Sequence, residues 1–425
     1  MKNTRIQAIE KKTNWVLILF LINVILMFGR PVDLIPAIGV IKPGLLITIM
    51  LIIAWLKSDQ VSRDIQEPVI KNYLALAFLT ILSAISAYNR GFTFLIFQNE
   101  IMYLFGFMFA SMLALQTRNN FMSFLKIWII IAIYLSMTVI SRGGTGTGGI
   151  YGDENDVGAT LVMLLPYLYF SPLLFSSKII KVIIYTGAAL CLLAIIATGS
   201  RGAFVGLLAV VGGIFYLSKH KFRLILLGAI ASLILLSFFV SDNYIQDLGT
   251  ISDTEESTSS ERLYTWGIGL LMFLDNPLLG VGAGQFTSAI CYYQPIEDIA
   301  NGERSLCFRA AHSSYVTLLS EFGMLGIIFF TLMIRKTIQY IKQCKKIVKS
   351  NLAQHLESNS YSDDINFIKV FSTIMILTLV GFFASGAFIS ILFYPLLWLP
   401  IGLIISLNRY SVRIDNQIKS DQQEQ

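Results

Sequence analysis

The chain has 425 residues, of which 55% are hydrophobic and only 14% are charged, and its formal net charge at pH 7 is +6. A typical soluble domain carries about 25% charged residues, so this composition excludes an ordinary soluble protein. Apolar runs of 17 or more residues recur along the sequence, and a helix needs about 20 such residues to cross a membrane. No basic patch is interleaved with aromatic residues, which argues against nucleic-acid binding. We therefore expect an all-α polytopic membrane protein.

The apolar runs predict about twelve transmembrane helices, and the first run is expected to remain as a span rather than to be cleaved as a signal. The spans lie near 14–29, 37–56, 69–87, 93–115, 121–140, 157–175, 179–198, 202–217, 222–240, 313–334, 366–386 and 388–407. With the N-terminus in the cytoplasm, 24 of the 32 Lys and Arg residues fall on the inner side, as the positive-inside rule requires. Both termini are then cytoplasmic, and the positive charge reflects membrane topology.

We expect a single integral membrane domain over 1–425, with two long connections between spans. The connection 335–365 is basic and then polar, and we interpret it as a solvated cytoplasmic loop near anionic lipid headgroups. The connection 241–312 falls on the outer side, and loops of that length usually have a function.

The outer loop is predicted to contain a helix near 261–275 that lies along the membrane interface. Its apolar residues recur at helical spacing at Leu263, Trp266, Leu270 and Leu274. Cys291 and Cys307 follow in the same loop, and an oxidising compartment would allow a disulfide between them, although two free thiols are the alternative. The spacing of Cys and His does not suggest a zinc site.

Four polar clusters fall on the outer side, and the predicted spans carry almost no charge, with Glu321 as the main exception. The clusters are 141–156, 198–202, 259–262 and 308–315. A transporter normally places ionisable groups along a pathway at mid-membrane. Polar groups gathered on one face instead favour a reaction at the outer surface.

Arg201 stands where a phosphate group can bind. From Val157 to Ser241 there is no Asp or Glu, so the guanidinium lacks a carboxylate nearby in the sequence. Three predicted spans begin on the outer side, just after Asp156, Arg201 and His312. Helix N-termini present free N–H groups and partial positive charge, and Gly202 lets the backbone approach a ligand closely.

Of the three histidines, only His312 falls on the predicted outer side, and two interpretations of its role are possible. A helix start disfavours the imidazolium, so a neutral ring there can accept a proton; alternatively, it caps the helix. The acidic segment with Asp153, Glu154 and Asp156 also allows two interpretations. These carboxylates can hold a divalent cation, or they can cap the next span, which we favour.

The segments "ATGSRGAFVGLL", "SERLYTWGIGLLMFLDNPLLGVGAGQF" and "AHSSYVTLLSEFGMLGIIFF" occur in this order. Together with "YGDENDVGATLVMLLPY", they resemble the signature of the bacterial O-antigen ligase and polymerase superfamily. The resemblance covers roughly 150–330. One departure is Ser313, where that signature often has Asn after the His.

The resemblance implies a glycosyltransferase-C-like fold in the bacterial inner membrane, with the active site facing the periplasm. It implies transfer of a glycan from an undecaprenyl-diphosphate-linked donor to an acceptor hydroxyl, without metal or cofactor and with inversion. Arg201 and Arg262 then grip the diphosphate together with Gly202, and His312 is the catalytic base. Supporting residues under this interpretation are Asp153, Asn155, Asp156, Ser200 and Ser313.

The acceptor is left open. It can be lipid A core, as for a ligase; the growing glycan, as for a polymerase; or another hydroxyl acceptor such as that of a protein. A polysaccharide flippase or another secondary transporter is the alternative from a different functional class, and a purely structural membrane component is a third.

Overall fold

The computed structural model describes residues 15–85, 87–217, 260–300, 305–353 and 361–423, and every regular element in these ranges is helical. In chain order the helices are Trp15–Gly29, α2 (Pro31–Leu34), α3 (Pro36–Val40), α4 (Pro43–Leu56), α5 (Val61–Ile65), α6 (Pro68–Ser83), α7 (Arg90–Tyr103), η2 (Leu104–Phe109), α8 (Ala110–Ala114), α9 (Arg118–Ser141), η3 (Gly149–Tyr151), α10 (Glu154–Phe170), η4 (Ser171–Leu174), α11 (Lys178–Ala197), α12 (Arg201–Leu217), an unlabelled helix 260–275, α15 (Phe286–Tyr293), α16 (Ile296–Ala300), α17 (Ser314–Ala353), α18 (Ser362–Ser385) and α19 (Pro395–Gln423). The all-α class predicted from the sequence is confirmed for this part of the chain.

Six helical stretches of the described residues are long and apolar enough to cross a membrane. They are Arg90–Ala114, Arg118–Ser141, Glu154–Leu174, Lys178–Ala197, Ser314–Asn351 and Ser362–Ser385, and four shorter apolar helices accompany them. The chain is therefore a membrane protein. The count of twelve spans stays a prediction, and the predicted span 222–240 lies outside the described residues.

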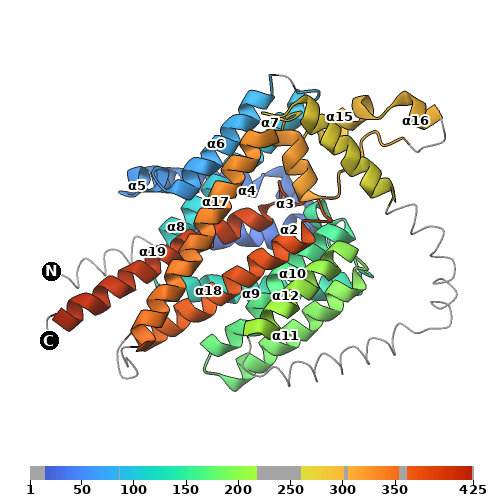
Figure 1. The fold of residues 1–425 in the computed structure, drawn as a ribbon. Helices are drawn as coiled ribbons and strands as arrows, with labels where there is room; N and C mark the ends of the chain where they lie inside the picture. Colours follow the sequence, from blue (N-terminus) through green and yellow to red (C-terminus); the bar gives the residue numbers. More distant parts are fainter. Residues whose placement is uncertain (1–14, 86, 218–259, 301–304, 354–360, 424–425) are drawn as a thin grey trace, which may run out of the picture.

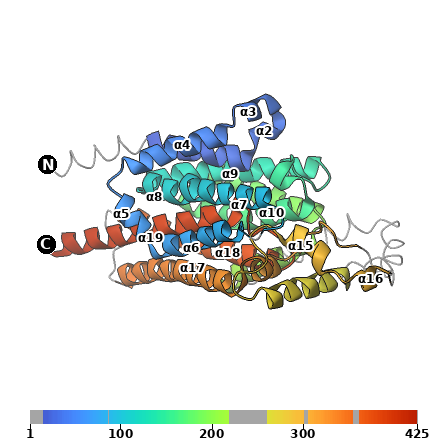
Figure 2. The ribbon, with the colours of Figure 1, turned by 90° about the horizontal axis from the view of Figure 1, so that it is seen from above.

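The helices form one elongated bundle (Figure 1). Figure 2 shows α4 and α9 along one edge and α17 along the opposite edge, with α10, α18 and α19 between them. Close contact inside the bundle depends on small residues. Gly206 of α12 faces the Ser385 hydroxyl of α18, where a Cβ would clash, and Gly381 of α18 is in tight contact with Val162 of α10. Small residues at such contacts let membrane helices pack backbone to backbone.

The last predicted span differs from the observed helix. We expected a span over 388–407, but residues 386–394 are irregular and α19 begins at Pro395. Proline is favoured at the first position of a helix because its missing N–H would have no partner there. The irregular segment passes the starts of other helices, and it supplies part of the site described below.

Helix α17 also differs from its prediction, because it continues through the predicted cytoplasmic loop 335–365 as far as Ala353, and α18 begins at Ser362. It is interrupted at Gly323, where φ is +59° and ψ is −157°. Residues 277–284 fill the break. Val281 N–H donates to the Ser320 carbonyl at 2.8 Å, and Met324 N–H donates to the Pro277 carbonyl at 2.8 Å. A broken helix inside a bundle needs such partners for its free backbone groups.

Glu321 is buried beside this break, and its carboxylate accepts hydrogen bonds from the N–H groups of Gly284 (2.7 Å) and Phe286 (2.8 Å). The main charge inside the predicted spans therefore joins the glycine-rich turn to the start of α15. A second buried carboxylate, Glu100 of α7, accepts a hydrogen bond from Thr80 at 2.9 Å. For Glu321, both carboxylate oxygens have partners within the bundle, so its contacts explain its burial without a transport pathway.

A small second core joins helix 260–275, α15 and the segment before α17. Its buried members are Ile268, Met272, Val281, Phe286, Ala289, Ile290, Leu306 and Ala311. In both views α15 and α16 lie at one end of the bundle, away from the end where α19 finishes (Figures 1 and 2). This second core holds the end of the molecule at which the predicted site residues lie.

Candidate active site

Arg201 is the first residue of α12, and the sequence "TGSRG" forms a tight connection that places it there. Helix α11 ends at Ala197, and Gly199 turns the chain with φ at +62°. Ser200 caps α12, because its hydroxyl accepts a hydrogen bond from the Ala203 N–H at 3.2 Å. The same hydroxyl donates to the Asn155 side-chain oxygen at 2.7 Å. The start of α12 is thus joined to the start of α10.

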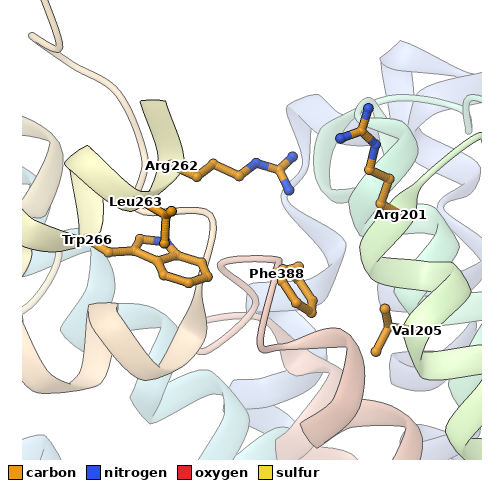
Figure 3. A pocket seen from close by; sticks show the side chains of 6 residues that line it. All are labelled: Arg201, Val205, Arg262, Leu263, Trp266 and Phe388. Atoms are coloured by element: carbon orange, nitrogen blue, oxygen red, sulfur yellow. The ribbon is translucent and has the colours of Figure 1, made fainter. Parts of the chain in front are cut away.

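Arg201 and Arg262 line the same cavity of about 390 Å³. Figure 3 shows the Arg262 side chain reaching across from helix 260–275 toward Arg201 on α12. The other lining side chains are apolar: Val205, Leu263, Trp266 and Phe388. Two guanidinium groups over an apolar floor suit an anion that is attached to a hydrophobic group, because arginine holds phosphate oxygens in a bidentate fork.

Helix 260–275 is held close to His312 by Trp266. The indole N–H of Trp266 donates to the Ala311 carbonyl at 2.8 Å, and its ring lies 6.3 Å from that of Phe388. Glu261 forms an ion pair with Arg309 in the same region. These contacts place Arg262, which lies between Glu261 and Trp266 on the helix, near the segment that leads into α17.

His312 directly precedes the Ser313 cap of α17, and its backbone has a φ of +47°. Few residues other than glycine adopt this left-handed conformation, and it persists where the surroundings hold it. Ser313 supplies part of that support. Its hydroxyl accepts from the Val316 N–H at 3.4 Å, and its own N–H donates to the Ser390 hydroxyl at 3.3 Å. The cap is therefore Ser313 rather than His312.

The pKa of His312 is lowered from its ordinary value, so the neutral ring is favoured. The main cause is that surrounding protein atoms displace water from the imidazole, and repulsion by the Arg262 guanidinium is the next cause. Arg309 lowers this pKa further, whereas Asp153 and Glu261 oppose the shift. The structure therefore places Arg262 and Asp153 within electrostatic reach of His312.

The acidic residues at the start of α10 serve mainly to order that start. Asp153 caps the helix by accepting a hydrogen bond from the Asn155 N–H at 2.7 Å. Asp156 accepts a hydrogen bond from the Tyr394 hydroxyl at 2.9 Å, and Asn155 is bonded to Ser200. In the described part of the chain, no group of three or more His, Cys, Asp or Glu side chains is placed to hold a metal ion.

Segment 386–394 joins the helix starts, and the sequence interpretation missed it because it was assigned to a span. Ser314, the first residue of α17, donates its N–H to the Gly386 carbonyl at 2.8 Å and its hydroxyl to the Ile389 carbonyl at 2.7 Å. Phe388 and Ile389 meet Gly202 of α12, where there is no room for a Cβ. Pro395, which marks a helix start, was the sequence signal that could have revealed this segment.

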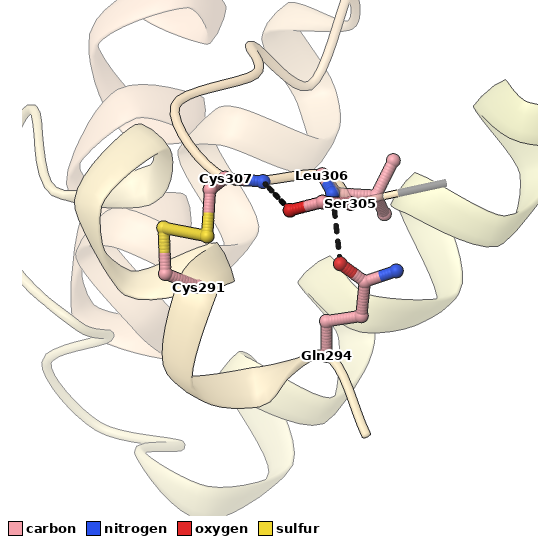
Figure 4. The surroundings of a disulfide bond; sticks show 5 residues. All are labelled: Cys291, Gln294, Ser305, Leu306 and Cys307. Carbon is pink, nitrogen blue, oxygen red and sulfur yellow. Dashed lines mark hydrogen bonds between the residues drawn. A yellow bond between two sulfur atoms is a disulfide. The ribbon is translucent and has the colours of Figure 1, made fainter. Parts of the chain in front are cut away.

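Cys291 of α15 and Cys307 are joined by a disulfide, with Cα atoms 4.5 Å apart (Figure 4). Beside it, the Leu306 N–H donates to the Gln294 side-chain oxygen at 2.8 Å. The bridge connects α15 to the chain that leads to His312. It therefore limits the movement of this part of the site relative to α15.

One family comparison bears on this arrangement. Residues 186–331 match the model of the O-antigen ligase family. The matched stretch contains Arg201, Arg262 and His312, and it ends inside α17. No curated protein matches the chain.

Proposed function

We propose, from the premise that this chain belongs to the O-antigen ligase and polymerase superfamily, that it transfers a glycan from an undecaprenyl-diphosphate-linked donor to an acceptor hydroxyl. The family indicates a role in surface glycan assembly. The observation that supports the finer proposal is the cavity that Arg201 and Arg262 line together, with Arg262 close enough to His312 to lower the pKa of its imidazole.

The cavity suits the donor by its chemistry. The diphosphate would lie between the two guanidinium groups and near the first N–H groups of α12, where the helix start adds positive charge. The apolar floor of Val205, Leu263 and Phe388 would accept the first part of the lipid tail. The arginines neutralise the negative charge that develops on the leaving diphosphate. Electrostatic stabilisation of this kind is usually the largest single contribution to catalysis.

His312 would act as the general base. The neutral imidazole takes the proton of the acceptor hydroxyl while the acceptor oxygen forms a bond to the anomeric carbon. The bond between this carbon and the diphosphate oxygen breaks, and the diphosphate leaves with the electron pair. Attack from the face opposite the leaving group inverts the anomeric centre. The step requires neither an enzyme nucleophile nor a metal, because the guanidinium groups carry the charge.

We also propose that this end of the molecule faces the periplasm, with both termini in the cytoplasm of an inner-membrane protein. The distribution of Lys and Arg supports this orientation. The disulfide between Cys291 and Cys307 supports it too, because such bonds persist outside the reducing cytosol. Helix 260–275 would then lie near the outer membrane interface and close over the donor.

The experiment is reconstitution of the purified chain in lipid nanodiscs with an undecaprenyl-diphosphate-linked glycan and candidate acceptors. We expect the wild-type chain to transfer the glycan. The Arg201→Ala and Arg262→Ala variants should still insert into the membrane but should lose this transfer. His312→Ala should lose turnover but keep donor binding, so full activity in that variant would refute the assigned role of the imidazole.

Deletion of the gene in its host distinguishes a polymerase from a ligase. Single capped repeat units on a gel would indicate a polymerase, and lipid-linked long chains that accumulate would indicate a ligase. Unchanged surface polysaccharide would count against the whole proposal.

A further inference from the structure

A second cavity, of about 760 Å³, lies between the turn that joins α6 to α7 and the disulfide region. Three aromatic residues line it, Tyr88, Tyr292 and Phe308, together with the polar side chains of Asn89, Arg90 and Ser288. Among the described residues it shares no lining residue with the arginine cavity. The reaction proposed above does not use it.

The aromatic side chains of this cavity are unusually open to solvent. The exposed fraction is 78% for Phe308 and 73% for Tyr292. Tyr292 and Tyr88 stack with ring centroids 4.9 Å apart and an interplanar angle of 18°. Phe308 has a φ of +63°, and its N–H is held by the Thr287 carbonyl at 3.1 Å. Large aromatic groups gathered on a surface mark a binding site more often than chance exposure does.

Both walls of the cavity are rigidly attached. Gln285, which is fully buried, accepts from the Asn89 N–H at 2.7 Å and donates to the Asn89 carbonyl at 3.0 Å. This pair fixes the turn that carries Tyr88 and Asn89 against the start of α15. On the other wall the disulfide connects the neighbours of Tyr292 and Phe308. The aromatic rings are therefore positioned before any ligand arrives.

The mixture of groups fits a glycan. Flat aromatic rings stack on the apolar faces of pyranose rings, and amide, guanidinium and hydroxyl groups at the edge can bond to sugar hydroxyls. A hydrocarbon tail would form no hydrogen bond with the polar side chains of Asn89, Arg90 and Ser288 that line the cavity. An extended sugar chain would use both kinds of group, which is how ligand cavities combine apolar walls with a few polar contacts.

The position of the cavity favours the acceptor, rather than the donor, as its ligand. Phe308 and His312 are four residues apart, so their Cα atoms lie at most about 14 Å from each other. The donor diphosphate is assigned to the separate arginine cavity, and His312 must reach a hydroxyl of the acceptor. We propose that the cavity of Tyr88, Tyr292 and Phe308 binds the acceptor, and that this acceptor is itself a glycan. This inference rests on the proposed transfer reaction.

The test measures the two substrates separately with the full chain in nanodiscs. The acceptors are oligosaccharides of one to four repeat units cut from the surface polysaccharide of the host. Tyr292→Ala and Phe308→Ala should each raise the KM for the oligosaccharide about tenfold, with kcat and the donor KM unchanged. Tyr292→Phe should behave as wild type because the ring remains. Ile296→Ala, at an 83% exposed apolar residue of α16 outside the cavity, is the matched control.

Saturation-transfer NMR with the same oligosaccharides, without donor, provides a readout that does not need turnover. Titration of the saturation signal of the sugar protons should give a dissociation constant about tenfold higher for each of the two alanine variants than for wild-type protein. An unchanged oligosaccharide KM in both variants would overturn the inference, and so would a rise in the donor KM instead. If Arg201→Ala still transfers glycan, the proposed function fails, whereas the NMR result reports on the aromatic cavity independently.

Discussion

Arg201 and Arg262 differ from most charged residues of this protein because they share a cavity whose remaining walls are apolar. A planar guanidinium can bind two oxygens of one phosphate, whereas a lysine ammonium acts as a point charge. The identity of the cation should therefore matter at these two positions, beyond its sign.

We predict that Arg201→Lys lowers kcat/KM for the lipid-linked donor by about tenfold or more, and that Arg201→Ala lowers it by about 10²-fold or more. Steady-state transfer assays in nanodiscs measure both. Arg142→Lys, at an exposed arginine outside the cavity, is the control and should keep wild-type rates. Normal turnover by the Arg201→Lys variant would show that the reaction does not need bidentate binding of phosphate oxygens by the guanidinium.

The pKa of His312 should respond in opposite directions to two neighbouring substitutions. Arg262 lowers this pKa and Glu261 raises it. Arg262→Gln should move the pKa up toward the ordinary value, and Glu261→Gln should move it further down. Histidine NMR titration of the full chain, which has only three histidines, measures both shifts.

The lowered pKa of His312 also determines how activity should depend on pH. A lowered pKa keeps the imidazole neutral at pH 7, so transfer should reach its plateau near neutral pH and fall only below pH ~6.5. Glu261→Gln should extend activity to lower pH. If activity of the Glu261→Gln variant falls at the same acidic pH as that of the wild type, a group other than His312 controls the loss of activity at low pH.

At the scale of the elements, helix α12 depends on a single cap. Ser200 bonds both to the Ala203 N–H and to Asn155 of α10. Ser200→Ala removes both bonds and should cost about 1 kcal/mol of stability, seen as a lower melting temperature in detergent. Ser200→Thr keeps a hydroxyl and should retain most of the stability. Equal melting temperatures for the two variants would contradict this role.

The disulfide is the second element that can be tested directly. Cys191 and Cys344 are free and buried, whereas Cys291 and Cys307 are joined. Protein that is denatured without reductant should therefore show two reactive thiols, and reduced protein should show four. The paired change Cys291→Ser with Cys307→Ser should destabilise the segment between them by about 3 kcal/mol, as expected for a loop of this length.

At the scale of the whole molecule, the bundle places the starts of α10, α12 and α17 at one end. Hydrogen bonds connect these starts directly, from Ser200 to Asn155, or through segment 386–394 by Ser314. The distribution of Lys and Arg predicts that this end lies outside the cytoplasm.

Labelling of single cysteines tests that orientation in a background without other cysteines. Glu297→Cys on α16 should react with a membrane-impermeant maleimide in intact spheroplasts. Lys349→Cys near the end of α17 should react only after the membrane is opened; both positions are exposed in the structure. Reaction of position 349 in intact spheroplasts would reverse the proposed sidedness.

The sequence by itself determined the features that depend on local chemistry. Long apolar runs require helices in lipid, because backbone groups must then find partners within their own segment. Residues such as Ser200 and Pro395 mark helix starts for equally local reasons. The position of Arg201 at a helix start could thus be deduced from "TGSRG" alone.

Only the tertiary structure decided which of these local features meet. Arg201 and Arg262 are far apart in the chain, and their shared cavity depends on how helix 260–275 packs through Trp266 and the second core. The break of α17 at Gly323 and the irregular segment 386–394 were likewise hidden, because apolar residues there read as continuous spans. Hydropathy records how much apolar surface a segment buries, but it does not record the partner against which that surface is buried.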